Sequence, residues 1–581
     1  MTPAPQPETL PLWIARLAGD QPTMGRQHGA LIAEAGGVDR ALDHYRDMPE
    51  RMLVGNGPGV ATRLARAAVT AGKELYLARL DRDRVPELRA RSIAFMEAAG
   101  KTARDARYVG VMDVFQGVVG LAGRLGVGPF APRARALAMA AAQPACSTVV
   151  AWGAASAGGV VRHARNFDFP GIGVWDAAPT LVLCAPDHGL RYGFVATRGG
   201  DVPVVTVFNE AGVTVTSHTR FHREVTVGGA AVIDLVHEIG RRATTLAEAA
   251  AIAAERPASV TWGLAVSSAR ERCAVSLEIH AGRVAVVEPA PGADFLTVAN
   301  RYRHPAMQDG QVASSAAWGL HSDARERRLR QLVAAAAPGG GADSDALMRM
   351  LSDREDADAP GVRRHLGGVL AAPYTVHSVV VEPETTSLLL AVGPAPASEG
   401  PFVRVRWAWD GPVGAWELGD AGLAGAGITV EPVAIDGVSR DDAGRWTSEA
   451  VRLEQTTRDP DAIAAALERA ITAAPDDPSL RLGATWSQLR RGDGVRALAH
   501  ARAGLVRETL PYRRAQLLMG ARAPRWSPAT PRPRPGCGAS STASAIPTPP
   551  TCRPGRAPTA AIRGGPGAAA PEAHLGLLDA S

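Results

Sequence analysis

Residues 145–169 read ACSTVVAWGAASAGGVVRHARNFDF, and this stretch decides the fold predicted for the rest of the chain. Two runs rich in β-branched residues, CSTVVAW and GVVRHARNFDF, flank the turn-forming AASAGG, so the stretch predicts a β-hairpin. Cys146 opens the first strand, and Arg165 and Asp168 lie near the end of the second. The hairpin would therefore bring a thiol, a cation and a carboxylate together.

Cys146 has two interpretations on the residues alone. A thiol attacks carbon well as a thiolate, and a guanidinium such as that of Arg165 stabilises this form. The other interpretation is core packing, because cysteine is among the most buried residue types. The spacing by itself favours packing.

A family resemblance adds to this pattern. Cys-Ser-Thr on a strand, a glycine turn and a strand ending Arg-Asn-Phe-Asp resemble the start of the mature chain in cysteine N-terminal nucleophile (Ntn) hydrolases. These include penicillin V acylases, bile-salt hydrolases and acid ceramidase. The chain most resembles the acyl-coenzyme A:6-aminopenicillanic acid acyltransferase family, over roughly Pro22 to Arg406. That family removes a long segment ahead of the cysteine by self-cleavage, and MGRQHG at 24–29 resembles its early Gly-x-x-His-Gly element.

The resemblance implies roles around the hairpin. Cys146 would be the nucleophile, Arg165 would lie beside its thiol, and Asp168 would bind its α-amino group, with Asn166 between them in the pattern. Cleavage of the Ala145-Cys146 bond would create that amino group, which titrates near ~7.7 to 8 and can serve as the base. Family members often have glycine where this chain has Ala145. Without the resemblance, an arginine and an aspartate at a strand end often form a mere surface pair.

Four further residues are candidates by the same resemblance. Asn300 resembles the asparagine whose amide helps bind the oxyanion, although asparagine after a strand is also a common turn former. Arg325 resembles in position the second arginine of the bile-salt hydrolase site, and in so charged a helix it would otherwise face solvent. The turn NEAG, beginning at Asn209, fits the family, but the second oxyanion donor would fall near His218. His218 could be that donor or a core histidine.

The order of predicted elements gives the fold class. Apolar residues recur at helical spacing over 38–125, and a connector at 128–144 would hold the scissile bond. Strands follow at 180–186, 191–197 and 202–219, then two helices, four strands, a helix at 322–337, another near 347 and two closing strands. This order predicts an α+β fold, a four-layer αββα sandwich, which the Ntn resemblance also implies.

We expect four parts along the chain. Residues 1–145 are a helical propeptide or α-chain segment, 146–406 the catalytic domain, and 407–520 a linker with a helical extension. ALERAITAAPDDPSL resembles the end of a tetratricopeptide unit, although a generic helical hairpin fits equally well; such helices could bind a protein partner. Residues 521–581 are rich in Pro and Arg, which predicts disorder. Our hypothesis is that they are a frame-shifted reading of a continuation of the helices.

Composition narrows the class of protein. The 581 residues are 46% hydrophobic and 21% charged, as in globular proteins, with no apolar run of ~18 residues and no secretion signal at the start. The five cysteines have no paired spacing, so neither a metal site nor a disulfide framework is indicated, and we expect a cytoplasmic protein. Seven arginines against two acidic residues after position 520 account for the net charge of +5, so nucleic-acid binding by the folded part has no support.

The sequence therefore predicts a self-processing cysteine hydrolase or acyltransferase. It would cleave a small-molecule acyl amide or acyl thioester through a thioester on Cys146, with water or an amine as acceptor and no cofactor. Two alternatives remain open: an ester or phospholipid hydrolase on the same fold, and a non-catalytic binding protein with an Ntn-like domain.

Overall fold

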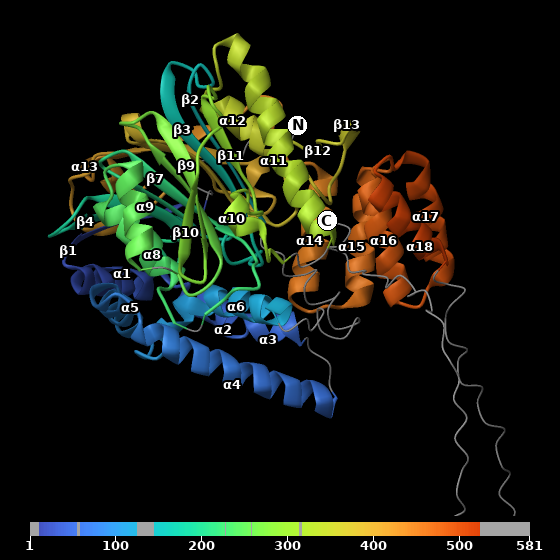
Figure 1. The fold of residues 1–581 in the computed structure, drawn as a ribbon, viewed down its shortest axis with the longest axis horizontal. Coiled ribbons are helices and arrows are strands. Elements are labelled where there is room, and N and C mark those ends of the chain that lie inside the picture. The colour runs from blue at the N-terminus through green and yellow to red at the C-terminus, as the bar shows by residue number, and fades with distance from the viewer. Residues whose placement is uncertain are drawn as a thin grey trace, which may run out of the picture.

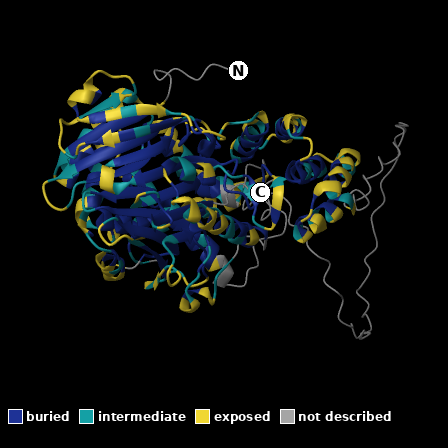
Figure 2. Cartoon of the chain, turned by 90° about the horizontal axis from the view of Figure 1, so that it is seen from above, coloured by how far each residue is buried: buried dark blue, intermediate teal, exposed yellow. Residues whose placement is uncertain are grey.

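The computed structural model describes residues 11–54, 59–124, 145–226, 228–256, 258–312 and 316–522. Two β-sheets pack face to face at its centre, and helices lie outside both of them (Figure 1). The strands are buried along most of their length (Figure 2). The predicted αββα sandwich is confirmed.

The first sheet has nine strands. Neighbouring strands are antiparallel, apart from the first strand of the chain, which runs parallel to β4. In spatial order the strands are β10 (Arg283–Val287), β9 (Cys273–His280), β8 (Trp262–Ser268), β7 (Val213–Thr219), β6 (Thr206–Asn209), β5 (Tyr192–Thr197), β4 (Pro179–Pro186), β1 (Trp13–Gly19) and β17 (Gly414–Glu417).

The second sheet has seven antiparallel strands and contains the predicted hairpin. In spatial order they are β11 (Phe295–Val298), β2 (Ala145–Gly153), β3 (Gly159–Asp168), β14 (Thr375–Glu382), β15 (Ser387–Ala391), β16 (Phe402–Trp407) and β18 (Ile428–Val433). Side chains alternate between its faces: Val379 and Val381 pack toward the first sheet, and Val380 packs toward the helices. This two-residue period fixes which residues of β2 and β3 meet.

Helices cover the outer face of each sheet. On the first sheet lie α1 (Gln21–Ala35), α5 (Pro86–Ala98), α8 (Val232–Arg242) and α9 (Leu246–Glu255). On the second lie α11 (Ala316–Ala336) and α12 (Ser344–Leu351). The N-terminal segment also contains α2 (Val38–Arg46), α3 (Met48–Leu53), α4 (Val60–Arg82) and α6 (Val111–Arg124), as its helical periodicity predicts. Shorter elements are α10 (Pro305–Gln308), α13 (Gly422–Gly425), β12 (Glu355–Asp356) and β13 (Ala359–Arg363).

The MGRQHG motif packs helix α1 closely against α5. A Cβ atom on Gly25 would lie 2.3 Å from the carbonyl oxygen of Arg91, and one on Gly29 would lie 2.2 Å from that of Phe95. Between these glycines in the motif, His28 is buried, and its Nδ1 lies 3.0 Å from Oδ1 of Asp201. The motif therefore joins the N-terminal segment to the sandwich.

The two sheets extend beyond residues 146–406. Strand β1 belongs to the N-terminal segment, yet it lies inside the first sheet between β4 and β17. Strands β17 and β18 follow Arg406, and each pairs with the edge of one sheet. The sequence analysis did not predict these strands, because they are short and their partners are distant in the chain.

A helical unit follows the sandwich. It consists of α14 (Asp442–Gln455), α15 (Pro460–Ala473), α16 (Pro478–Arg490), α17 (Gly494–Arg507) and α18 (Pro511–Arg522), and it lies beside α11 in Figure 1. In the part of the chain that the structure describes, each helix is too short or too polar to cross a membrane. The predicted connector and the predicted tail beyond residue 522 lie outside the described residues.

Candidate active site

The hairpin register places Arg165 beside the thiol of Cys146. Cys146 pairs with Phe167 across the strands, and Arg165 pairs with Thr148. Side chains of Cys146, Thr148, Arg165 and Phe167 therefore share the face toward the other sheet. Nη2 of Arg165 lies 3.2 Å from Sγ of Cys146, as the sequence predicts.

Arg165 is fully buried and joins the two sheets. It donates hydrogen bonds to the carbonyl oxygens of Val205 and of Ser217, the latter at 2.7 Å, and it stacks 4.8 Å above the ring of Phe167. Burial nevertheless raises the pKa of the Cys146 thiol, although Arg165 opposes the rise. The thiol of the intact chain is therefore protonated at neutral pH, and it needs a base before it can attack.

Polar side chains converge on the main-chain atoms of Cys146. Its N–H donates to Oδ1 of Asn300 at 3.0 Å, and its carbonyl oxygen accepts from Nη1 of Arg325 at 2.8 Å. Arg325 also donates to Oδ1 of Asn300 at 2.9 Å and to Oγ of Ser147 at 2.7 Å. The structure thus brings Arg325, on α11, to the same residue as the hairpin pair.

Asp168 lies on the opposite face of β3 from Arg165, three residues along the strand. It is opposite Ala145 in the register, its Oδ1 accepts from Oγ1 of Thr375 at 2.6 Å, and its Oδ2 lies 3.7 Å from Arg325. Oδ2 accepts no hydrogen bond from the described residues. Burial raises the pKa of Asp168 to about 6, against the effects of Arg325 and Thr375.

Asn300 differs from its predicted orientation. Its Oδ1 faces two donors, on Cys146 and Arg325, so its Nδ2 points the other way and donates to the carbonyl oxygen of Thr219 at 3.0 Å. In the intact chain, Asn300 therefore holds the nitrogen of Cys146 through its oxygen, and the carbonyl oxygen of Thr219 takes one of its two amide N–H groups. The sequence analysis assigned the donor side of this amide to catalysis.

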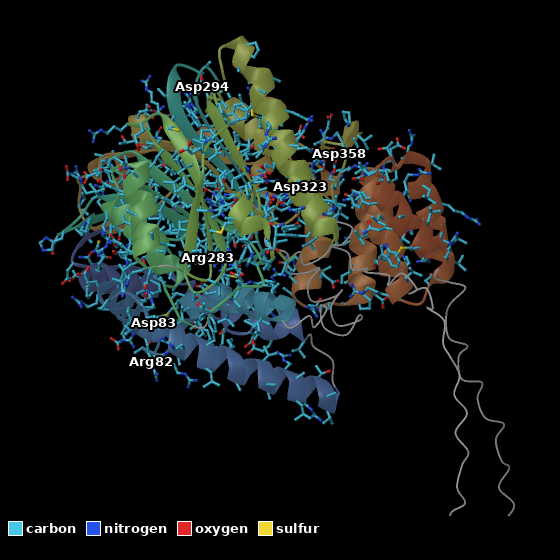
Figure 3. All side chains as sticks on the ribbon, in the orientation of Figure 1. Arg82, Asp83, Arg283, Asp294, Asp323 and Asp358 are labelled. Atoms are coloured by element: carbon cyan, nitrogen blue, oxygen red, sulfur yellow. The ribbon has the colours of Figure 1, made fainter. Side chains whose placement is uncertain are left out.

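The segment around Asn300 is held from several sides. The main-chain N–H of Asn300 donates to Oγ of Ser322 on α11 at 3.0 Å. Buried Glu278 accepts from Arg220 and from the N–H groups of residues 303 and 304. Asp323, labelled on α11 in Figure 3, pairs with Arg301 at 2.9 Å. The sequence analysis named none of these residues, because their partners come from separate elements.

Two candidates of the sequence analysis, Asn209 and Asn166, have other partners. Asn209 accepts from the N–H groups of residues 211 and 213 in its turn and donates to two carbonyl oxygens at the end of α8. Its turn lies about 20 Å along the strand from Thr219. Asn166 faces α12 and donates to the carbonyl oxygens of Leu351 and Leu370. The structure does not bring Asn209 or Asn166 to the thiol; both hold loops.

His218 lies between the sheets and contacts Thr148, two residues after Cys146 on β2. One of its ring nitrogens lies 2.9 Å from Oγ1 of Thr148, and the ring is fully buried. Burial, followed by the charge of Arg165, holds the pKa of His218 well below its ordinary value. His218 is thus a neutral core histidine near the site, the second of the two interpretations that the sequence left open.

An apolar cavity of about 80 Å³ borders Cys146. Its polar lining includes Ser217 and Thr219, and it continues toward a second cavity of about 50 Å³ that shares part of its wall. Aromatic side chains make up much of the first cavity: Tyr45, Tyr108, Phe167, Phe169, Trp175 and Trp262. Tyr45 and Tyr108 belong to the N-terminal segment, so this segment builds part of the site.

Among the described residues, one group of side chains has ligand atoms close enough together for a metal site. The ligand atoms of His222, Glu224 and His280 lie within 4.8 Å of one another. Both ring nitrogens of His222 already bond to main-chain groups, of Asp309 and of Glu224, and its ring stacks on that of His280 at 3.9 Å. Because both nitrogens of His222 are taken, only Glu224 and His280 in this group keep ligand atoms without a hydrogen bond to a described residue, which is too few to hold a metal ion.

Three solved structures resemble part of the chain. An N-acylethanolamine-hydrolysing acid amidase ortholog from Caenorhabditis elegans is 14% identical, with 41% of this chain and 93% of that chain covered and a TM-score of 0.28. A mutant conjugated bile acid hydrolase from Clostridium perfringens is 10% identical, with 51% and 98% covered and a TM-score of 0.31. Penicillin V acylase from Agrobacterium tumefaciens is 13% identical, with 45% and 90% covered and a TM-score of 0.25.

Two of them are named as a bile acid hydrolase and a penicillin V acylase, and none of the three is named as an acyltransferase. Since each TM-score is below 0.5, the fold assignment rests on the chain's own sheet order and layers. No family model and no curated protein matches the sequence.

Proposed function

We propose that the chain is a self-processing cysteine Ntn hydrolase or acyltransferase that acts on amides with apolar acyl groups. The observation that carries this proposal is the set of buried side chains gathered on the main-chain nitrogen and oxygen of an internal residue. Asn300 binds the nitrogen of Cys146 and Arg325 binds its oxygen. A peptide nitrogen is not basic, whereas the α-amino group that cleavage would leave there is.

Cleavage would begin at the bond between Ala145 and Cys146. Sγ of Cys146 attacks the carbonyl carbon of Ala145, the C–N bond breaks, and the thiol proton goes to the leaving nitrogen, which gives a thioester. Water then hydrolyses the thioester to the carboxylate of Ala145 and the free thiol. We assign to Asp168, opposite Ala145 in the register and with Oδ2 free of hydrogen bonds from the described residues, the relay of this proton from the thiol to the leaving nitrogen.

The processed enzyme would use the new amino group as its base. The group takes the proton of the Cys146 thiol as Sγ attacks the substrate carbonyl, and it returns that proton to the leaving nitrogen. The negative charge of Asp168 would hold the ammonium form, and Arg165 would stabilise the thiolate. The second N–H of the Asn300 amide is the donor that we assign to the oxyanion.

The apolar cavity at Cys146 supports an apolar acyl group as substrate. Its aromatic wall would bury a hydrocarbon chain or ring. Tyr45 and Tyr108 contribute to this wall, so the N-terminal segment would have to stay bound after cleavage. Strand β1, held inside the first sheet, supports that requirement. Acyl transfer to an amine and hydrolysis by water share every step up to the thioester.

Intact mass and N-terminal sequencing of the purified protein test the proposal. We expect two chains, one of them beginning at Cys146, that elute together from a sizing column. The Cys146→Ala variant should remain one full-length chain of the same fold. A wild-type chain that hydrolyses amides while it stays full-length would contradict the self-processing mechanism, and a processed chain that cleaves esters but not matched amides would contradict the substrate class.

A further inference from the structure

The C-terminal helical unit docks on residues 364–375, the segment that leads into β14. Arg364 forms two hydrogen bonds of 2.7 Å with the carboxylate of Glu508, and both side chains are fully buried. Nδ1 of His365 lies 2.7 Å from Asp477, at the start of α16. A buried bidentate pair has one favourable geometry, so these contacts fix the unit on the sandwich.

The same segment reaches the catalytic strand. The carbonyl oxygen of Leu370 accepts from Nδ2 of Asn166 at 2.9 Å, and Thr375 donates to Asp168 at 2.6 Å. Ser448 on α14 donates to the carbonyl oxygen of Pro373, between these two contacts, at 2.6 Å. Helix α14 therefore lies over the end of the hairpin that carries Ala145 and Cys146.

Val451 on α14 belongs to a small apolar cluster with Ala145, Ala372 and Tyr374. Val451 is 1% exposed and Ala145 is 3% exposed, so no solvent separates them from the cluster. The residue on the N-terminal side of the proposed scissile bond is thus covered by the C-terminal unit. The cavity at Sγ, by contrast, is walled in part by the N-terminal segment.

The chemistry of the proposed reaction relates these two sides. The leaving nitrogen of a substrate takes its proton from the α-amino nitrogen of Cys146. In the intact chain that nitrogen is bonded to Ala145, so the leaving group must approach from the region next to Ala145. After cleavage, Ala145 is a chain end and is free to withdraw from the cluster.

We propose that cleavage opens an apolar subsite, bounded by Val451, Ala372 and Tyr374, that binds the amine half of the substrate or an acceptor amine. The inference rests on the self-processing function proposed above. Val451, Ala372 and Tyr374 are uncharged, and the nearby carboxylate of Asp168 is the group assigned to the Cys146 ammonium, so the fitting ligand is an amine with an apolar substituent. Val451 is then a specificity-determining residue supplied by the C-terminal helical unit.

The test compares two amides that share an acyl group. Phenylacetamide releases ammonia, and N-benzylphenylacetamide releases an apolar amine; octanoyl and benzoyl pairs serve as second and third acyl groups. Val451→Phe should fill the subsite and lower kcat/KM for the benzylamides at least about tenfold more than for the primary amides. Val451→Ala, which keeps the fold with a smaller side chain, should raise the ratio of kcat/KM for the benzylamide to kcat/KM for the primary amide.

Ile463→Phe is the matched control, because Ile463 is equally buried in the helical unit but belongs to a different cluster. A general packing defect lowers both amides alike, so the control should leave the ratio unchanged. A Val451→Phe enzyme that is processed and loses both amides equally overturns the subsite and leaves the proposed function standing. A processed wild-type chain that cleaves none of the six amides overturns the proposed function itself.

Discussion

Replacing Asp168 with asparagine should stabilise the protein while it abolishes processing. Asp168 is fully buried, and its Oδ2 accepts no hydrogen bond from the described residues. The nearest cation, Arg325, lies 3.7 Å away and is already shared among other acceptors. Asparagine keeps an oxygen for the Thr375 hydroxyl but brings no charge into this place. The wild-type chain would therefore be less stable than the variant because it keeps a carboxylate beside Cys146.

The two pKa values of Asp168 set the size of the effect. Its ordinary pKa is 3.8, and burial raises it to about 6 in the folded protein. At about 1.4 kcal/mol per pH unit, ionised Asp168 then disfavours the folded state by about 3 kcal/mol above pH 6. Because the folded state binds the proton more tightly, this penalty shrinks as the pH falls, to about 1 kcal/mol near pH 4.5. The stabilisation by Asp168→Asn should shrink in parallel.

The measurement is chemical unfolding near pH 7.5 and near pH 4.5, in a Cys146→Ala background. That background keeps every sample full-length, so processing does not alter the stability. Asp323→Asn, which removes a carboxylate paired with arginines at the surface of α11, is the control and should not stabilise at either pH. If Asp168→Asn gives no stabilisation near pH 7.5, or an equal one at both pH values, the reasoning from burial is refuted.

Two further substitutions test the site and the packing. Arg325→Gln removes the donors to the Cys146 carbonyl oxygen and to Oδ1 of Asn300, which position Cys146, and should slow the appearance of the cleaved chains about a hundredfold. Arg327→Gln, on the exposed side of the same helix, should not slow it, and equal rates for the two variants would contradict the positioning role. Gly29→Ala places a Cβ 2.2 Å from the Phe95 carbonyl oxygen and should lower the thermal midpoint of unfolding. Gly72→Ala, with open space around it, should raise the midpoint slightly. An unchanged midpoint for Gly29→Ala would contradict the close packing of α1 and α5.

The hairpin was predictable because its information is local. β-Branched runs and a glycine turn define β2 and β3, and the two-residue period then places Arg165 on the thiol's side. Strand β1 shows the limit of such reasoning. Its seven residues include Arg16, whose buried guanidinium is satisfied by the carbonyl oxygens of Ala408 and Ala426, almost four hundred positions away. Nothing near Arg16 in the sequence announces those partners.

The sequence predicted which residues lie at the site better than it predicted what each of them bonds to. The family resemblance named Arg325 and Asn300, and the structure places both on Cys146. The direction of the Asn300 amide depends on which groups face it, and those groups come from β2, β7 and α11. Thr375 was missed for the same reason: it opposes Asp168 only once β14 pairs with β3.

Cleavage before Cys146 would change one nitrogen and leave the two sheets intact. Segments on both sides of the proposed scissile bond are held independently: β1 lies inside the first sheet, and β2 lies between β11 and β3 in the second. Breaking the bond before Cys146 frees Ala145 from its small cluster and leaves the strands of both sheets paired, so most core contacts are the same before and after. What changes is one nitrogen, from an amide that donates to Asn300 into an amine with a lone pair. Under the proposed function, the buried Arg165, Arg325 and Asp168 around Cys146 would serve the amine that cleavage leaves there.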